Sequence, residues 1–280
     1  ESLTRLTSGL ADRVVAVSGG VAAYVRDALG VPTERIVVIP NGVDPERFRP
    51  GLEPLLLGDD VAPGFRFLFV GGFLWRKGID ILLDAYERAF SRADDVTLLL
   101  KDFGALGPYV PQEAAERVGR MAEDPAAPRI AHFTGTLPES DMPRLYAAAD
   151  CLVHPYRGEG YGLPIAEAMA CGLPVIIPDR GAARDFTDAE TAVLVSSRVV
   201  RGEPEVGGHR LAGPSETVEI DPDDLAASMR RCFERPQDGH DLGAAASVAI
   251  RAEHTWAAAA RVAVGRIAGL AESARVVTPS

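Results

Sequence analysis

Short apolar runs alternate with segments of helical periodicity through most of this 280-residue sequence. This alternation predicts βα units, in which helices cover both faces of a parallel sheet. The predicted strands are Phe67–Val70, Val96–Leu100, Ile130–Phe133, Leu152–His154, Val175–Ile177 and Ala192–Val195. The predicted helices between them are Ile79–Phe90, Glu113–Ala122, Asp141–Ala148 and Pro164–Ala170. The pattern therefore predicts an α/β fold with a doubly wound, Rossmann-like parallel sheet.

Four loops that follow predicted strands are rich in glycine and polar residues. They are residues 71–78, 101–111, 134–137 and 154–163. In an open parallel sheet, ligands bind outside the carboxyl ends of the strands. We therefore expect these four loops to converge on one crevice.

The two ends of the chain read as separate segments. In residues 1–50, strands Val14–Val17 and Ile36–Ile39 flank a helix over Gly20–Leu29, and the Pro- and Gly-rich stretch that follows predicts a linker.

Residues 51–252 form the main predicted domain, with a surface insertion at 196–220. Residues 253–280 form a C-terminal helix and tail. The helices predicted after the insertion are Asp223–Phe233, Leu242–Ala252 and Thr255–Ala271. Because the sequence begins at Glu1 without methionine, we expect it to be part of a longer protein.

Composition excludes some classes of partner. The net charge of −11 argues against a broad surface for nucleic acid or anionic membrane, although a local basic pocket fits with it. Cys151 and Cys171 lie in apolar runs and predict buried thiols in a reducing, cytoplasmic compartment. Together with Cys232 they show no metal-ligand spacing. The sequence has no apolar run of membrane-spanning length, so we expect no transmembrane segment.

The stretch from Glu159 to Glu167 carries the strongest functional signal. Gly160 and Gly162 allow a ligand to approach the backbone, and Pro164 suits the start of a helix. The amides of a helix start, with the helix dipole, favour a bound phosphate. The two carboxylates can accept hydrogen bonds from sugar hydroxyls. Phosphate donors beside hydroxyl acceptors predict a nucleotide-sugar site.

A second signal is Trp75-Arg76-Lys77-Gly78, which follows a predicted strand and the Gly71-Gly72 turn. Cations at the start of a helix oppose its dipole, so their placement there costs free energy. A bound diphosphate reverses the local electrostatics. We therefore prefer a phosphate-binding role to a solvated basic pair.

The same residues fit other interpretations. Glu159 and Glu167 also fit a glycosidase acid/base pair, but they straddle a phosphate-type loop, which favours ligand positioning over hydrolysis. Gly158–Gly162 with Asp179 resembles a degenerate dinucleotide fingerprint, although its third glycine is off register; Asp179 fits a helix cap equally well.

Two further patterns favour a structural interpretation. Asp221-Pro222-Asp223 has the spacing of a metal-binding DxD, yet its place before a helix predicts a cap. His154 precedes the glycine loop, and we expect a hydrogen-bonded core imidazole. We expect no metal site.

With these residues identified, the chain resembles the retaining glycosyltransferases of family 4, which have the two-domain GT-B fold. The resemblance rests on Glu159 and Glu167 at the family's E-x7-E spacing, on the turn 159–164, and on the sequence 167–176 that follows. Residues 65–250 resemble the whole nucleotide-sugar domain. Residues 11–18 and 36–44 resemble the end of the acceptor domain and its linker, and the final helix resembles the one that crosses back to that domain.

The resemblance implies roles for individual residues. Lys77 would contact the donor phosphates, Glu159 would lie near the donor sugar, and Glu167 would accept hydrogen bonds from ribose hydroxyls. Lys77 and Glu159 are thus the expected catalytic residues. The other expected donor-binding residues are Gly71, Gly72, Arg76, Lys101, Gly135 and Thr136 (near the base), and Gly160, Tyr161, Gly162, Leu163 and Glu167.

One departure from the family concerns the phosphate cations. The family usually carries an arginine five residues before the lysine, and Gly72 occupies that place here. We hypothesise that Arg76 or Lys101 replaces it.

The expected function is transfer of a sugar, with retention, from a nucleoside-diphosphate sugar to an unidentified saccharide, lipid-linked sugar, protein or small molecule. The expected reaction uses no cofactor and no bound metal. We expect residues 1–280 alone to bind donor and to transfer little. The alternatives are a non-catalytic nucleotide- or sugar-binding domain and an NAD-dependent oxidoreductase.

Overall fold

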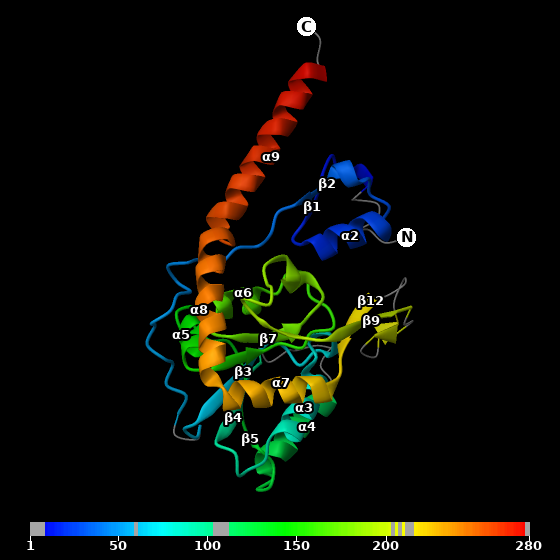
Figure 1. Cartoon of the computed structure of the whole chain (residues 1–280). Helices are drawn as coiled ribbons and strands as arrows, with labels where there is room; N and C mark the ends of the chain where they lie inside the picture. Colours follow the sequence, from blue (N-terminus) through cyan, green and yellow to red (C-terminus); the bar gives the residue numbers. More distant parts are fainter. Residues whose placement is uncertain are drawn as a thin grey trace.

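A six-stranded parallel sheet organises the chain (Figure 1). The computed structural model describes residues 9–58, 61–102, 112–202, 205–206, 209–210 and 216–277. The strands of the sheet are β3 (Phe65–Val70), β4 (Val96–Lys101), β5 (Arg129–Phe133), β6 (Cys151–Val153), β7 (Val175–Pro178) and β8 (Val193–Val195). The predicted doubly wound sheet is confirmed, and each predicted strand ends within two residues of the observed one.

The order of the strands shows where the direction of the sheet reverses. The order is β5-β4-β3-β6-β7-β8, so the chain runs outward from β3 to β5 and then returns to the other side of β3 as β6. Phe67 pairs with Cys151, and Leu68 with Leu152, at the place where the direction reverses. Such a topological switch point is where open α/β sheets bind ligands. The loops after β3 and β6 flank it.

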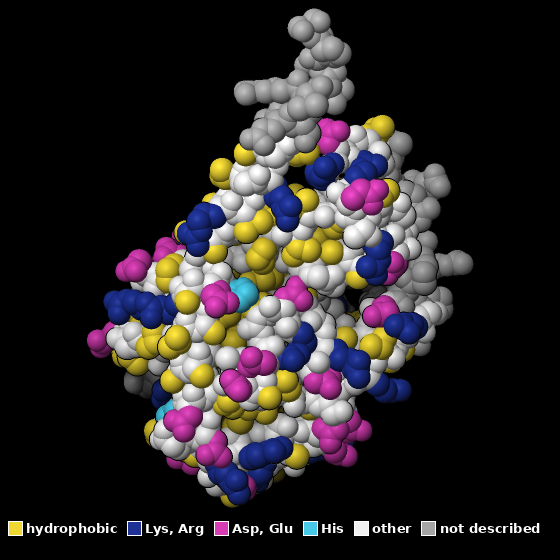
Figure 2. All heavy atoms as spheres, turned by 45° about the horizontal axis from the view of Figure 1, so that its top comes forward, with side chains coloured by type: hydrophobic (Ala, Val, Ile, Leu, Met, Phe, Trp, Pro, Cys, Tyr) yellow, Lys and Arg dark blue, Asp and Glu magenta, His cyan; other side chains and the backbone are white. Residues whose placement is uncertain are grey.

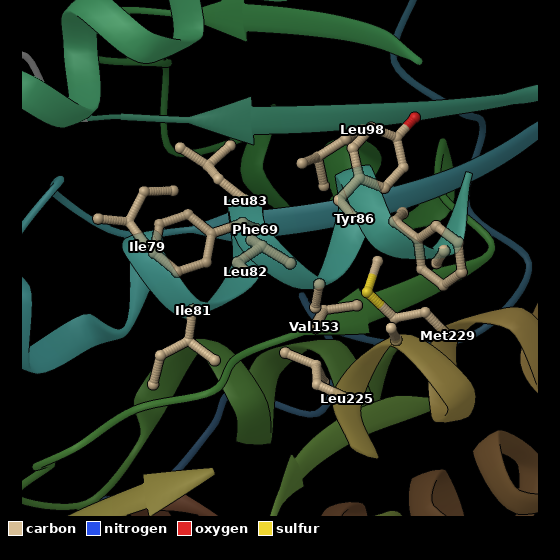
Figure 3. Close-up of a cluster of buried hydrophobic side chains, with 14 of the residues drawn as sticks. Phe69, Ile79, Ile81, Leu82, Leu83, Tyr86, Leu98, Val153, Leu225 and Met229 are labelled. Carbon is tan, nitrogen blue, oxygen red and sulfur yellow. The ribbon is translucent and has the colours of Figure 1, made fainter. Parts of the chain in front are cut away.

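Helices bury both faces of the sheet. Phe67 and Phe69 of β3 belong to a core cluster formed with α3, α4 and α7, whereas Leu68 and Val70 belong to a second cluster formed with α5, α6 and α8. This follows from the alternation of side chains along a strand. Figure 3 shows the first cluster, in which side chains of α3 and of α7 lie together beside Val153 of the sheet. The helices are α3 (Ile79–Ala89), α4 (Gln112–Glu123), α5 (Met142–Ala147), α6 (Leu163–Ala170), α7 (Pro222–Glu234) and α8 (Pro236–Glu253), with 3-10 turns η2 (Trp75–Lys77) and η3 (Ala182–Asp185).

The first described residues form a small N-terminal unit. It consists of β1 (Val14–Ala16), α2 (Gly19–Asp27), the 3-10 turn η1 (Thr33–Arg35) and β2 (Ile36–Val38), with β1 and β2 parallel. Ser18 caps α2 by accepting a hydrogen bond from the amide of Val21 at 3.2 Å. The amide of Gly19 donates to Asp185 Oδ2 at 2.6 Å, which ties this unit to the sheet domain.

The segment that follows the N-terminal unit meets the junction of α8 and the next helix at one place. Val43 forms a parallel bridge with Thr255, just before α9 (Trp256–Val277) begins. The Val43 amide donates to the carbonyl of His254 at 2.9 Å, and the Trp256 amide donates to the carbonyl of Val43 at 3.3 Å. A Cβ on Gly42 would lie 2.1 Å from the Trp256 nitrogen, so the two segments approach too closely for a side chain there. From this junction α9 projects away from the sheet (Figure 1).

The predicted insertion contains regular structure that the sequence did not indicate. Strands β9 (Ser197–Arg201) and β12 (Glu216–Ile220) form an antiparallel pair, and β10 (Glu205–Val206) pairs with β11 (His209–Arg210). Residues 203–204, 207–208 and 211–215 of the insertion lie outside the described residues. The sequence predicted a surface insertion at 196–220 but no strands within it, so these strand pairs add to that prediction. The domain boundaries proposed from the sequence stay predictions.

Figure 2 shows acidic and basic side chains interspersed over one face of the molecule, with apolar side chains gathered toward its middle. Among the described residues, no helix combines the length and apolarity that crossing a membrane requires.

Candidate functional site

The loops after β3 and β6 lock together at the switch point. Gly78 ends the turn η2 with φ +74°, and a Cβ there would lie only 2.0 Å from the carbonyl oxygen of Pro155. Only glycine satisfies both constraints. The amide of Arg157 donates to the carbonyl of Arg76 at 2.8 Å, which adds a second tie between the two loops.

Lys77 and Glu159 form an ion pair across this contact, although 82 residues separate them in the sequence. Lys77 Nζ donates to Glu159 Oε1, and Arg76 Nη1 lies 3.7 Å from Glu159 Oε2. The Lys77 and Glu159 side chains are only 12% and 8% exposed. A Cβ built on Gly71 would lie 3.7 Å from Lys77 Cδ, so the lysine stem runs beside the predicted glycine turn. The structure thus brings the two predicted catalytic residues together.

His154 lies behind this ion pair and is fully buried. Its Nε2 is 3.7 Å from Glu159 Oε1, and neither ring nitrogen has a hydrogen-bond partner among the described residues. Burial lowers the pKa of His154 to about 4, so the ring is neutral at neutral pH. The predicted burial is confirmed, but the expected hydrogen bonds were wrong.

Arg157 holds the loop of Glu159 in place, and sequence reasoning missed it. Its guanidinium makes two hydrogen bonds to Asp80, at 2.6 and 2.7 Å, and one to Glu219 of β12, at 2.6 Å. It also lies over the ring of Trp75, 4.3 Å from the centroid. The amide of Val218 donates to the carbonyl of Arg157 at 2.9 Å. The insertion thus fixes the loop two residues before Glu159.

Arg157 also forms a wall of a cavity of about 420 Å³ between α3, the β8–β9 connection and the start of α7. Neither Lys77 nor Glu159 lines this cavity. It therefore lies apart from the ion pair at the switch point.

The glycine turn forms the start of α6 as predicted, one residue earlier than Pro164. Gly162 is the N-cap with φ +98°. The amide of Ile165 already donates to the Gly162 carbonyl at 3.0 Å, and Pro164 has no N–H. Of the first three helical residues, this leaves the amide of Leu163 available for an anion, together with the positive end of the helix dipole.

The turn before α6 also contains Tyr161 and Gly160. The Tyr161 ring packs against Phe186 at 4.9 Å between centroids, and its buried hydroxyl has no hydrogen-bond partner among the described residues. Burial raises the pKa of Tyr161 to about 12. A Cβ on the exposed Gly160 would lie 3.8 Å from Val17. The turn thus lies close to the N-terminal unit.

Glu167 lies in a different environment from Glu159. Its Oε2 accepts a hydrogen bond from the hydroxyl of Tyr146 on α5 at 2.8 Å. Burial raises the pKa of Glu167, while this hydrogen bond and the charge of Arg47 lower it in part. The described contacts of Glu167 do not join it to Glu159.

The remaining predicted donor residues lie at the ends of β3 to β5. Gly71 and Gly72 are buried, and Thr136 is exposed. The buried amine of Lys101 donates to the carbonyls of Asp102, at 2.8 Å, and Gly135, and burial lowers the pKa of Lys101. Residues 103–111 of the predicted loop lie outside the described residues.

These contacts discriminate between the two proposed replacements for the missing arginine. Lys101 is bonded to backbone carbonyls, whereas Arg76 lies beside the Lys77–Glu159 pair. They therefore favour Arg76.

Two structural interpretations can be checked. Asp221 accepts a hydrogen bond from the Asp223 amide at 2.8 Å and caps α7, which confirms the predicted cap. Asp179 accepts a hydrogen bond from the hydroxyl of Ser197, and η3 is capped by no side chain, so the cap proposed for Asp179 was wrong. Over the described part of the chain, no group of three or more His, Cys, Asp or Glu side chains has the arrangement of a metal site.

Comparison with known proteins identifies the fold and the family. The fold is that of the C-terminal, Rossmann-like domain of GT-B proteins. Residues 64–234 match the model of the group 1 glycosyl transferases, and residues 1–47 match that of glycosyltransferase family 4. The chain therefore belongs to the group 1, or family 4, glycosyltransferases.

Two curated relatives illustrate the similarity. The chain is 34% identical to the lipopolysaccharide core biosynthesis mannosyltransferase LpsB of Rhizobium meliloti, over 66% of this chain and 51% of that protein. It is also 34% identical to the D-inositol 3-phosphate glycosyltransferase of Geodermatophilus obscurus, over 67% of this chain and 43% of that protein. The chain thus spans about half the length of these relatives.

Solved structures show the same fold. Anabaena Alr3699/HepE in complex with UDP and glucose superposes with a TM-score of 0.71 at 20% identity, over 97% of this chain and 68% of that one. Sucrose-phosphate synthase from Thermosynechococcus elongatus gives a TM-score of 0.71 at 25% identity, over 97% and 61%.

Proposed function

We propose that this chain supplies the donor site of an enzyme that transfers a sugar from a nucleoside-diphosphate sugar, with retention of configuration. The observation that carries the proposal is the meeting of Lys77 and Glu159 at the switch point of the sheet, between β3 and β6. A cation, a carboxylate and a helix start lie on the loops at this edge. These are the groups that a phosphate and a hydroxylated sugar require.

The chemistry follows from where charge develops. When the glycosidic bond breaks, the leaving diphosphate gains negative charge. Lys77, with Arg76 beside it, would stabilise that charge from a fixed position, and such preorganised groups each contribute about 3–4 kcal/mol to lowering a barrier. In the structure Lys77 is paired with Glu159, so the diphosphate competes with Glu159 for the ammonium. Glu159 is then free to accept hydrogen bonds from the sugar.

The substrate class is supported by the relatives. One solved relative is in complex with UDP-glucose, and one curated relative is named a GDP-mannose-dependent mannosyltransferase. We propose a nucleoside-diphosphate hexose as the donor. We propose a saccharide, lipid-linked sugar, protein or small molecule as the acceptor.

We also propose that residues 1–280 alone bind the donor but transfer little sugar. Before the linker, the described residues form only the small N-terminal unit, in which two short strands pair. An acceptor needs a larger surface to be held in line with the donor.

Thermal unfolding of the 280-residue chain tests donor binding. UDP, GDP, ADP and their hexose derivatives are added in turn, with NAD as the contrasting ligand. One nucleoside diphosphate and its sugar are expected to raise Tm, and Lys77→Ala is expected to remove that rise. Stabilisation by NAD alone would support the oxidoreductase and refute the proposal.

A second candidate is a domain that binds the nucleotide sugar without turnover, which Gly72 in place of the usual arginine favours. Assay of the full-length protein separates the two. Transfer of the hexose, with the anomeric configuration of the product read by NMR, supports the enzyme. Donor binding with neither transfer nor hydrolysis supports the second candidate.

A further inference from the structure

The hydrogen bond between Tyr146 and Glu167 joins two helices on one side of the sheet. Tyr146 is fully buried on α5, and its hydroxyl donates to Glu167 Oε2 on α6 at 2.8 Å. Burial raises the pKa of Tyr146 well above its usual value, and the charge of Glu167 raises it further. The tyrosine is therefore always protonated at physiological pH and always acts as the donor.

Packing fixes the Tyr146 ring. The ring lies in the core cluster with Met169 and Leu145, and it contacts the ring of Phe48 from the linker, with centroids 6.2 Å apart. Holding the ring fixes the position of the hydroxyl oxygen, because a tyrosine side chain has only two rotatable torsions before that oxygen. The carboxylate that accepts from it is fixed in turn.

The bond leaves one oxygen of Glu167 for a ligand. Oε2 is occupied by Tyr146, whereas Oε1 accepts no hydrogen bond from the described residues. A carboxylate accepts up to about four hydrogen bonds, so Oε1 retains its capacity. The Tyr146 hydroxyl that donates a hydrogen bond to Oε2 is neutral. It therefore does not neutralise the negative charge of the Glu167 carboxylate.

We propose that Tyr146 is the positioning residue for ribose recognition: its hydroxyl holds Oε2 of Glu167 so that Oε1 accepts from the ribose hydroxyls of the nucleotide. This inference rests on the proposed donor site. It adds a residue on α5, outside the glycine turn and outside the lysine loop, as a determinant of nucleotide affinity.

Calorimetry with matched ligands tests the proposal. The ligands are the nucleoside diphosphate that stabilises the chain and its 2′,3′-dideoxy counterpart, which lacks the hydroxyls that Glu167 would read. The wild-type chain is expected to bind the dideoxy compound about 10- to 100-fold more weakly, as expected for losing a hydrogen bond to a charged group. Tyr146→Phe is expected to bind the ribose compound about tenfold more weakly and to leave the affinity for the dideoxy compound unchanged.

A second buried tyrosine provides the control. Tyr86 on α3 is also fully buried, and its hydroxyl donates to the carbonyl of Arg129 at 2.6 Å. Tyr86→Phe is expected to lower Tm to a similar extent, because it also removes a buried hydrogen bond. It is expected to keep the wild-type ratio of the two affinities.

The possible outcomes are distinct. If Tyr146→Phe lowers the affinity for both ligands equally, the role of Tyr146 is merely structural and the inference is overturned. The variant then keeps the wild-type ratio of the two affinities. A wild-type chain that binds both ligands equally removes Glu167 from ribose recognition and overturns it too. If no nucleoside diphosphate binds the wild-type chain, the proposed function fails with it.

Discussion

Glu159 and Glu167 lie eight residues apart, yet the protein holds them by opposite means. Glu159 is in a loop, and cations from another loop surround it: Lys77 in direct contact and Arg76 at 3.7 Å. Glu167 is on a helix, and its carboxylate is held by the neutral hydroxyl of Tyr146. A cation can exchange its ion pair with Glu159 for one with a bound phosphate. The buried, neutral hydroxyl of Tyr146 cannot.

This difference indicates different tasks. Around Glu159 the hydrogen-bonding and ionic contacts can be redistributed during a reaction in which charge develops. Around Glu167 the geometry is fixed before any ligand binds, which suits recognition. Variants that separate these two environments therefore distinguish a residue of the reaction from a residue of binding.

The largest effect is expected from removing the charged environment of Glu159. In the full-length protein, Lys77→Ala and Glu159→Gln are each expected to lower kcat about 10²- to 10³-fold, since one preorganised group contributes about 3–4 kcal/mol. Steady-state kinetics with the identified donor measures this. Arg88→Ala removes an exposed cation at the other end of α3 and is expected to keep the wild-type rate. Full activity in Lys77→Ala would refute the catalytic assignment.

The next effect concerns what holds the loop of Glu159. Arg157→Leu is expected to lower the free energy of unfolding by about 3 kcal/mol, because it leaves Asp80 and the partly buried Glu219 without their cation. Urea unfolding measures the change. Arg201→Leu breaks the exposed ion pair with Glu216 on the same insertion and should cost about 0.5 kcal/mol or less. Similar costs for the two variants would show that Arg157 does not fix the loop.

The buried imidazole behind Glu159 predicts a pH dependence. Because the pKa of His154 is about 4 in the folded chain and about 6.5 when unfolded, the unfolded state binds more protons between these values. The free energy of unfolding that comes from the neutral His154 is fully present above about pH 6.5 and is lost as the pH falls. Between pH 7 and pH 5 the loss from His154 is about 2 kcal/mol.

His132 and His254 also have pKa values lowered by burial, so the contribution of His154 is measured as a difference between proteins. Between pH 7 and pH 5, the free energy of unfolding of His154→Gln is expected to fall less than that of the wild type. Urea unfolding at each pH measures this difference. Identical losses would place the titration elsewhere.

The smallest effect separates the two cations proposed to replace the missing arginine. Arg76→Ala is expected to weaken nucleoside diphosphate binding by several-fold, about 1 kcal/mol, because its side chain is half exposed. Lys101→Met is expected to change Tm instead, since its amine bonds backbone carbonyls. Calorimetry and thermal unfolding of both variants measure this. The reverse pattern would assign the phosphate to Lys101.

Much of the fold could be predicted because the core elements are strongly periodic. Runs such as Val96–Leu100 are mostly apolar and are buried on both faces, as strands between two helical layers must be. The β9–β12 pair was missed because its residues are largely polar and charged. Its stability comes from cross-strand pairing, such as Arg201 opposite Glu216, which a single segment does not reveal.

The residues that meet at the candidate site could be named from the sequence where a motif concentrates the chemistry. Lys77 and Glu159 each lie in a glycine-marked loop after a strand, and the strand order brings those loops together. The roles of Arg157 and Tyr146 could not be predicted, because each depends on partners from distant segments. From the sequence, an arginine next to a glycine loop is expected to be exposed to solvent. Only the fold shows that Asp80 and Glu219 bind it.

The pairing of Val43 with Thr255 has a mechanical consequence. Since the segment around Val43 and the start of α9 are hydrogen-bonded to each other, they act as one strap that moves as a unit. Any swing of the N-terminal unit would pivot on this strap and carry the base of α9 with it. A side chain introduced at Gly42 would force the strap apart and so alter the pivot without touching any residue of the crevice.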